Sequence, residues 1–243
     1  MLFRSDDRAA GAVPVMIVAT AGTTGAGMID PLHACADIAK QQALWLHIDA
    51  AWGGAALASN RLRGLLAGIE RADSMIIDAH KWLATTMGCA IFITRRADLL
   101  SEAFHASTSF MPSSISGVDP YLNSVQWSRR FLGLRLFLAL AAAGWEGLGA
   151  HVDRSVEVME RIKQRLIAAG WHIANDSPLA VLDAIPPASR GDVRALVRRV
   201  VASGRAWVAP TTFEGQDVVR ICATNGETAM ADVDTLIAAL NEA

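Results

Sequence analysis

The stretch VPVMIVAT, residues 13–20, is a β-branched apolar run that ends in a glycine-rich turn, and LWLHIDA, residues 44–50, is a second such run. Between them, Asp30 and Pro31 predict the start of a helix that extends to about Gln42, with Asp30 as its N-cap. A strand, a helix and a strand in this order form a βαβ unit, whose two strands are parallel and whose crossover is nearly always right-handed. This stretch therefore predicts an α/β fold.

The same alternation continues along the first half of the chain. We expect a helix near residues 61–67 and a strand at residues 74–79 (SMIIDA). The apolar segment 88–94 (GCAIFIT) follows after a turn too short for a crossover, so it should pair antiparallel or lie elsewhere in the sheet. Residues 105–118 are rich in serine, proline and glycine, which predicts a long surface loop.

The second half changes to an α+β pattern. A long helix is expected over residues 120–143, and after residues 144–147 a second helix carries one apolar stripe: Val152, Val156, Met159, Ile162 and Leu166. A strand, a helix, two strands and a helix are then expected at residues 180–184, 192–203, 206–213, 218–224 and 231–240. We therefore predict two domains: residues 1–145, the carboxy-terminal part of a larger domain with a mostly parallel sheet, and a smaller α+β domain at residues 146–243.

Composition and charge exclude several classes of function. The 243 residues are 52% hydrophobic and 19% charged, which suits a folded protein with a substantial core. A formal net charge of −2 argues against a nucleic-acid-binding surface. The longest apolar run, residues 136–145, is roughly half of the ~20 residues that a spanning helix needs, and acids stand where a signal peptide has its apolar part. We therefore expect neither a membrane nor a nucleic acid as partner.

The three cysteines, Cys35, Cys89 and Cys222, are far apart and form no C-x-x-C pair. This spacing indicates neither a disulfide framework nor a zinc ribbon. We expect them to be core-filling thiols in a protein of the reducing cytoplasm.

Three polar segments follow predicted strands, at the edge of an open α/β sheet where ligands bind. They are TAGTTG at residues 20–25, HIDAAWGG at residues 47–54 and DAHKW at residues 78–82. Gly22 and Gly25 of the first segment, together with Gly27, follow the order G-x-x-G-x-G, which matches neither the dinucleotide fingerprint nor a P-loop. They indicate either a tight turn between a strand and a helix or a site where backbone amides, together with Thr23 and Thr24, hold an anion weakly.

Asp49 and Lys81 carry the more specific signal. Taken separately, Asp49 is equally well a structural carboxylate, and Lys81 is more often a solvated surface lysine. Taken together, a strand-end aspartate and a strand-end lysine are what pyridoxal 5'-phosphate requires. The lysine forms an imine with the aldehyde, and the aspartate keeps the pyridine nitrogen protonated, so that the ring accepts electrons. Ala51, on the same strand face as Asp49, is small enough to pack flat against the ring.

HIDAAWGG and DAHKWL resemble the group II pyridoxal-phosphate-dependent amino-acid decarboxylases, which have fold type I. The similarity includes ATAGTTGAGMIDPL, QWSRR at residues 126–130 and RICATN near the end, and covers nearly the whole chain. It implies that Lys81 forms the imine, that Asp49 pairs with the pyridinium nitrogen, and that four other residues lie around the cofactor: Thr20, Ala51, Asp78 and His80. Asp78 and His80 would lie near the phosphate, but family members commonly carry asparagine at the position of Asp78. The resemblance also implies a homodimer.

Two departures from the family pattern have consequences. Counted from Lys81, Phe110 falls where many of these decarboxylases carry a catalytic loop tyrosine. Either the product shifts to an aldehyde, as in relatives with phenylalanine there, or the loop is repositioned and another group donates the proton. The family's subunit also has a long segment before the position of Val13, with the phosphate-binding turn and a ring-stacking histidine. We therefore expect a gene fragment, a misplaced start, or half of a split protein.

The leading interpretation is a carboxy-lyase, a truncated pyridoxal-phosphate-dependent decarboxylase that acts on an L-amino acid and uses no metal. A second interpretation is a metal-dependent hydrolase that uses four ligands at H-x-D and D-x-H spacing: His47, Asp49, Asp78 and His80. A third is a non-catalytic fragment that folds only by dimerising with itself or with a separate amino-terminal half. Arg220 either meets a substrate carboxylate, as the resemblance implies, or forms a structural ion pair.

Overall fold

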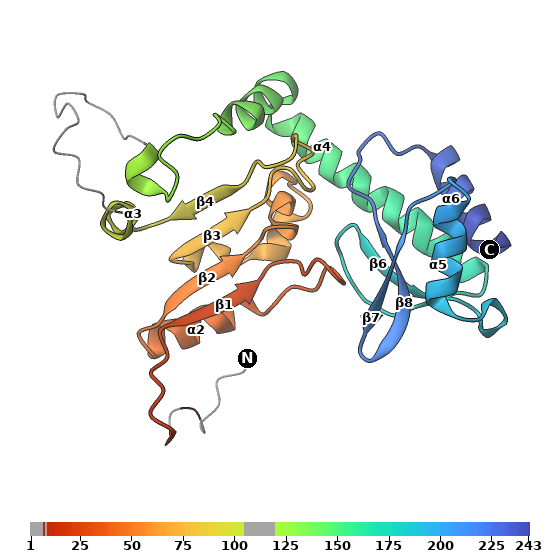
Figure 1. The fold of residues 1–243 in the computed structure, drawn as a ribbon, viewed down its shortest axis with the longest axis horizontal. Coiled ribbons are helices and arrows are strands. Elements are labelled where there is room, and N and C mark those ends of the chain that lie inside the picture. Colours follow the sequence, from red (N-terminus) through yellow and green to blue (C-terminus); the bar gives the residue numbers. More distant parts are fainter. Residues whose placement is uncertain (1–6, 8, 105–119) are drawn as a thin grey trace.

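The computed structural model describes residue 7 and residues 9–104 and 120–243 (Figure 1). The surface loop expected at residues 105–118, with Phe110, lies outside this part of the chain. The first half forms a four-stranded sheet in the order β1-β2-β3-β4, with β1 Met16–Thr20, β2 Trp45–Asp49, β3 Ser74–Ile77 and β4 Ile91–Thr94. The first three strands are parallel and β4 pairs antiparallel with β3. The expectation of an α/β fold is confirmed, and of the two placements left open for the 88–94 segment, antiparallel pairing is the one found.

Helix α2 (Leu32–Gln41) packs its buried residues, Leu32, Cys35, Ala36 and Ala39, on one face of this sheet. Asp30 does not cap it: Pro31 holds the N-cap position, and no side chain bonds to the helix end there. The Asp30 carboxylate instead accepts a hydrogen bond from the Thr20 amide at 2.8 Å, and the Asp30 amide donates to the Thr20 carbonyl at 2.9 Å. The expected cap is therefore wrong, because the Asp30 carboxylate accepts its hydrogen bond from the Thr20 amide at the end of β1.

The connection from β2 to β3 consists of three short 3-10 segments, at Gly53–Ala58, Arg63–Leu66 and Ile69–Arg71. The helix expected near residues 61–67 is thus only a single turn. Gly68 interrupts it with φ +101°, a left-handed conformation that side-chain-bearing residues rarely adopt. Leu62, Leu66 and Ile69 are nevertheless buried, so the apolar positions contribute to the core without forming a regular helix.

Helix α4 (Gly133–Ala168) begins later than the helix expected from residue 120, where a short 3-10 turn (Pro120–Asn123) stands instead. The intervening segment 124–130 is largely polar and offers no stripe to bury. Gly144 has φ 67° and ψ 175°, so α4 consists of two helical parts joined by a kink. The predicted stripe is confirmed: Val152, Met159, Ile162 and Leu166 are buried, and Val156 packs against the core. The division of the chain at residues 145/146 stays a prediction.

The second half contains an antiparallel sheet in the order β5-β6-β8-β7 (Figure 1). Its strands are β5 His172–Ile173, β6 Val181–Ile185, β7 Ala209–Phe213 and β8 Gln216–Cys222. Helices α5 (Val193–Ala202) and α6 (Met230–Glu242) pack with α4 around it. The Asp192 carboxylate caps α5 by accepting a hydrogen bond from the Ala195 amide at 2.7 Å. The expected order of elements in this half is confirmed.

Several hydrogen bonds join the two halves. Arg220 Nε on β8 donates to the carbonyl of Thr24 at 2.7 Å, and Asn175 Nδ2 donates to the carbonyl of Ala26 at 2.8 Å. The short helix α3 (Ala97–Ala103) lies at the other end of the molecule (Figure 1). In the described part of the chain, no helix has the length and apolarity needed to cross a bilayer.

Candidate functional site

The carboxyl ends of β1 and β2 lie side by side and present Thr20 and Asp49 as register partners. Residues that are paired in this way point to the same face of a parallel sheet, here the face opposite α2. The Ala21 amide donates to the Asp49 carbonyl at 2.8 Å, which fixes the turn after β1 against the end of β2. Thr20 and Asp49 are both partly exposed, so they form an accessible polar edge.

Asp49 holds its carboxylate in place by a local bond. Its Oδ1 accepts a hydrogen bond from the Ala51 amide at 3.0 Å, so the carboxylate is oriented by the chain that leaves the strand. The Ala51 carbonyl accepts a hydrogen bond from the Asp78 amide at 3.0 Å. The segment that follows Asp49 and the segment that leads to Lys81 therefore run next to each other.

Lys81 lies in a turn directly after β3. Its Nζ is 2.9 Å from Asp78 Oδ2, and the side chains of Lys81 and Asp78 are 32% and 15% exposed. The Lys81 amide also donates to the Asp78 carbonyl at 3.0 Å, so backbone and side chains of the two residues are linked. Sequence reasoning placed Asp78 near a phosphate and missed this ion pair. The three-residue spacing was the only signal for it.

The residues next to Lys81 are held by the protein interior. His80 Nδ1 lies 2.8 Å from the Cys89 carbonyl, and the His80 amide donates to the same carbonyl at 3.0 Å. Trp82 is fully buried and stacks on Trp52, with ring centroids 4.8 Å apart. The turn that carries Lys81 is therefore held on both sides of the lysine, by the hydrogen bonds of His80 and by the buried ring of Trp82.

The glycine-rich segment is a closed turn. The amides of Gly22 and Thr23 both donate to the Met28 carbonyl, and Thr23 Oγ1 accepts from the Met28 amide at 3.1 Å. A Cβ on Gly53 would lie 2.1 Å from the Ala21 carbonyl oxygen, so the turn after β2 approaches this one too closely for any side chain. The amides of Gly22 and Thr23 are therefore bonded within the turn, and whether this segment also holds an anion stays a prediction.

The four residues of the metal-site alternative have other partners. His47 Nδ1 lies 2.8 Å from Ser74 Oγ and its ring stacks near Phe92, while Asp78 pairs with Lys81. In the described part of the chain, no group of three or more His, Cys, Asp and Glu side chains is placed to hold a metal ion. The structure thus gives this alternative no support.

Arg220 is neither in an ion pair nor aimed at a strand-end acid among the described residues; its Nε bonds to the carbonyls of Thr24 and Gly25. Opposite it on β6, Asp183 is completely buried, and both of its carboxylate oxygens lack a hydrogen-bond partner in the described part of the chain. Burial raises the pKa of Asp183 to about 6, and the nearby Arg220 charge partly opposes this shift. Burial also raises the pKa of the Cys222 thiol. Sequence reasoning did not single out Asp183.

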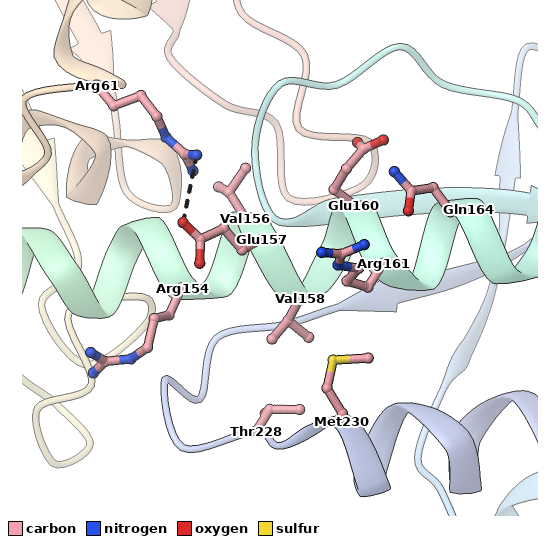
Figure 2. Close-up of a pocket in the computed structure, with 10 residues that line it drawn as sticks. All are labelled: Arg61, Arg154, Val156, Glu157, Val158, Glu160, Arg161, Gln164, Thr228 and Met230. Atoms are coloured by element: carbon pink, nitrogen blue, oxygen red, sulfur yellow. Dashed lines mark ion pairs between the residues drawn. The ribbon is translucent and has the colours of Figure 1, made fainter.

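A hollow of about 650 Å³ lies elsewhere in the described part of the chain. Figure 2 shows it along α4, where Val158 points toward Thr228 and toward Met230 at the start of α6. Arg61 reaches α4 from the first half and lies 3.8 Å from Glu157. None of the residues predicted for the site lines this hollow, so it is a separate feature from the site predicted around Asp49 and Lys81.

Comparisons with known proteins point to one protein family. The pyridoxal-dependent decarboxylase conserved domain matches residues 4–177. The aromatic-L-amino-acid decarboxylase of Bacillus atrophaeus is 28% identical over 236 residues, which is 92% of this chain and 49% of that protein. The cysteine sulfinic acid decarboxylase of Homo sapiens is 39% identical over 166 residues, 65% of this chain and 34% of that protein. The crystal structure of Oryza sativa TDC with PLP and tryptamine matches with a TM-score of 0.89 and 27% identity, over 98% of this chain and 52% of that one. The chain thus spans about half the length of these relatives, or less.

Proposed function

The chain belongs to the pyridoxal-dependent decarboxylase family, and we propose that it provides the lysine and the aspartate for pyridoxal-phosphate-dependent decarboxylation of an L-amino acid. One observation carries the proposal: Asp49 ends β2 and Lys81 follows the adjacent parallel strand β3, and the bond from the Asp78 amide to the Ala51 carbonyl joins their segments. An oriented carboxylate and a primary amine thus stand at one edge of the sheet, where α/β folds bind ligands.

The chemistry of these donors fits the cofactor. Asp49 is held by one carboxylate oxygen, which leaves the other to accept a hydrogen bond from a pyridinium nitrogen. Lys81 supplies an amine for the aldehyde carbon, and Ala51 presents a small side chain beside Asp49. When bound, pyridoxal phosphate would supply a ring that accepts the electrons released as carbon dioxide leaves. The resemblance assigns Thr20 and His80 to the same surroundings, and this assignment stays a prediction.

The chain's own residues would do three things in this reaction. Asp49 would hold a proton on the ring nitrogen by keeping a negative charge next to it. Lys81 would bind the aldehyde and, once replaced by the substrate's amino group, would stand free to take up or return a proton. The stacked Trp52 and Trp82 would keep the turn that carries Lys81 in one position, since both rings are buried.

The cofactor assignment is tested by spectroscopy of the purified chain with pyridoxal phosphate. We expect a yellow complex that borohydride bleaches, with the reduced cofactor on Lys81. Lys81→Ala should abolish the colour, and Lys40→Ala, which removes an exposed lysine on α2, should keep it. A metal-restored hydrolytic activity that survives Lys81→Ala would contradict the proposal and favour the metal-dependent alternative.

The product and the assembly are further parts of this proposal. We propose a homodimer in the cytoplasm whose product is either the amine or, because Phe110 replaces a tyrosine, an aldehyde. With a full-length enzyme, amine stoichiometric with carbon dioxide and without hydrogen peroxide would contradict the aldehyde route. A single-subunit mass in sedimentation would contradict the dimer.

A further inference from the structure

We propose that Asp78 is a catalytic residue for attaching the aldehyde to Lys81: it removes a proton from the lysine ammonium and returns it to the departing water. This inference rests on the proposed function, because it assumes that Lys81 reacts with an aldehyde. The inference goes beyond the proposed function because it gives a chemical role to Asp78, whose negative charge would otherwise repel a nearby phosphate.

The position of Asp78 suits this role. Its Oδ2 is 2.9 Å from the reacting Nζ, which is within direct proton-transfer distance. The backbone bonds from the Lys81 amide to the Asp78 carbonyl and from the Asp78 amide to the Ala51 carbonyl keep the two side chains in register. Asp78 is also the less exposed partner, with 15% of its side chain in contact with solvent, so water competes poorly for its carboxylate.

Two other polar side chains of these segments each have one atom bonded elsewhere. Asp49 Oδ1 bonds to the Ala51 amide, and His80 Nδ1 bonds to the Cys89 carbonyl. In the described part of the chain, Asp78 is the residue that forms the ion pair with Lys81. It is therefore the group best placed to move a proton at Nζ.

The proton and electron balance closes without another reactant. The Asp78 carboxylate takes one proton from the ammonium, which frees the nitrogen lone pair. This lone pair forms the C–N bond while the C=O π electrons move to oxygen, which takes a second proton from the same nitrogen. Asp78 then gives its proton to the hydroxyl oxygen, the C–O bond breaks, and water leaves. The products are a protonated C=N bond, one water molecule and the original carboxylate.

A competing role for Asp78 is repulsion of the cofactor phosphate, and two aldehyde probes separate the roles. Pyridoxal phosphate and pyridoxal carry the same aldehyde, but only the first carries the phosphate. If Asp78 transfers protons, Asp78→Asn slows the reaction of both probes with Lys81. If Asp78 only repels phosphate, the same variant accelerates capture of pyridoxal phosphate and leaves capture of pyridoxal unchanged.

The experiment uses the 243-residue chain, borohydride quenching at set times, and mass spectrometry of the labelled lysines. Lys40 is an internal reference, because it is exposed and lies on a different element. We expect Asp78→Asn to slow labelling of Lys81 by both probes by about tenfold or more, with Lys40 unaffected. As a matched control, Asp98→Asn removes the exposed Arg96–Asp98 ion pair and should leave Lys81 labelling unchanged.

A second variant tests the proton transfer itself. Asp78→Ala should be slow, and added formate should restore Lys81 labelling, since a small carboxylate can occupy the vacated space. A purely structural role for Asp78 would show no formate effect, and that result would overturn the inference. Equal Lys81 labelling in Asp78→Asn and wild type would overturn it as well. If wild-type Lys81 reacts no faster than Lys40, the proposed function fails first, and the inference falls with it.

Discussion

The two sheets of this chain differ in what lies on the face opposite their main helices. In the first sheet that face is open: Met16, Val18 and Phe92 are 47%, 58% and 50% exposed. In the second sheet the corresponding face is closed against the glycine-rich turn of the first half, where Ser177 Oγ donates to the Gly27 carbonyl. Asp183, on this closed face, is completely buried.

The contrast shows that a residue is buried when other segments pack against its face of the sheet, whether or not the residue is apolar. Parallel strands are usually covered on both sides, and the near-continuous apolar runs of β1 to β3 have the composition of such strands. Yet the apolar Val18 is open to solvent, whereas the acidic Asp183 is enclosed. Three further predictions test this contrast by unfolding measurements on single variants.

The largest effect on the free energy of unfolding is expected on the faces that helices cover, which are buried in both sheets. Leu46→Ala on β2 and Leu182→Ala on β6 should each lower the free energy of unfolding by about 3 kcal/mol, because each removes a buried side chain under a helix layer. Urea unfolding followed by circular dichroism measures both. A cost below about 1 kcal/mol for Leu46→Ala alone would mean that the first sheet is loosely packed on its covered face as well.

Asp183 should give an intermediate effect that depends on pH. Its pKa rises from 3.8 to about 6 on folding, so the folded chain keeps this proton to a higher pH than the unfolded chain. The resulting stabilisation is complete below about pH 4 and is lost as the pH rises through about 6. Asp183→Asn should remove this loss and be more stable than wild type by at most about 3 kcal/mol at pH 7.5, but not at pH 4. Identical pH profiles in urea titrations would show that the carboxylate is hydrated or paired.

The smallest effect is expected on the open face. Val18→Lys should change the free energy of unfolding by at most about 0.5 kcal/mol, since the side chain already contacts water. Its neighbour Ile17 points to the covered face, so Ile17→Lys is the matched control and should be strongly destabilising. If Val18→Lys is as damaging as Ile17→Lys, this face is covered in solution and the contrast between the sheets disappears.

Local patterns were sufficient for much of the architecture. The apolar runs at β1, β2 and β3 and the 3.6-residue stripe on α4 appear where they were predicted. Such features depend on residues close together in the chain, so a sequence pattern captures them. The segments that carry Asp49 and Lys81 are joined by the bond from the Asp78 amide to the Ala51 carbonyl, whereas the roles of the two residues stay a prediction.

Other features depended on which of several possible partners or conformations the folded chain selects, and the sequence alone does not show this. Asp30 had two amides within reach, that of the helix start and that of Thr20, and it bonds to the strand end. The helix predicted near residues 61–67 is a 3-10 turn, although Leu62 and Leu66 are buried as in an amphipathic helix. In each case two local solutions compete, and packing against the rest of the chain selects one.

By itself, the sequence determined the βαβ start of the fold, the strand-end positions of Asp49 and Lys81, and the motifs typical of the decarboxylase family. Only the tertiary structure decided that Asp78 pairs with Lys81, that the glycine-rich turn uses its own amides, and that Asp183 is enclosed opposite Arg220. The physical reason is the distance along the chain between the residues that decide each feature. Backbone periodicity is written into neighbouring residues, whereas the partner and the solvation of a charged side chain are set by segments that meet only when the chain folds.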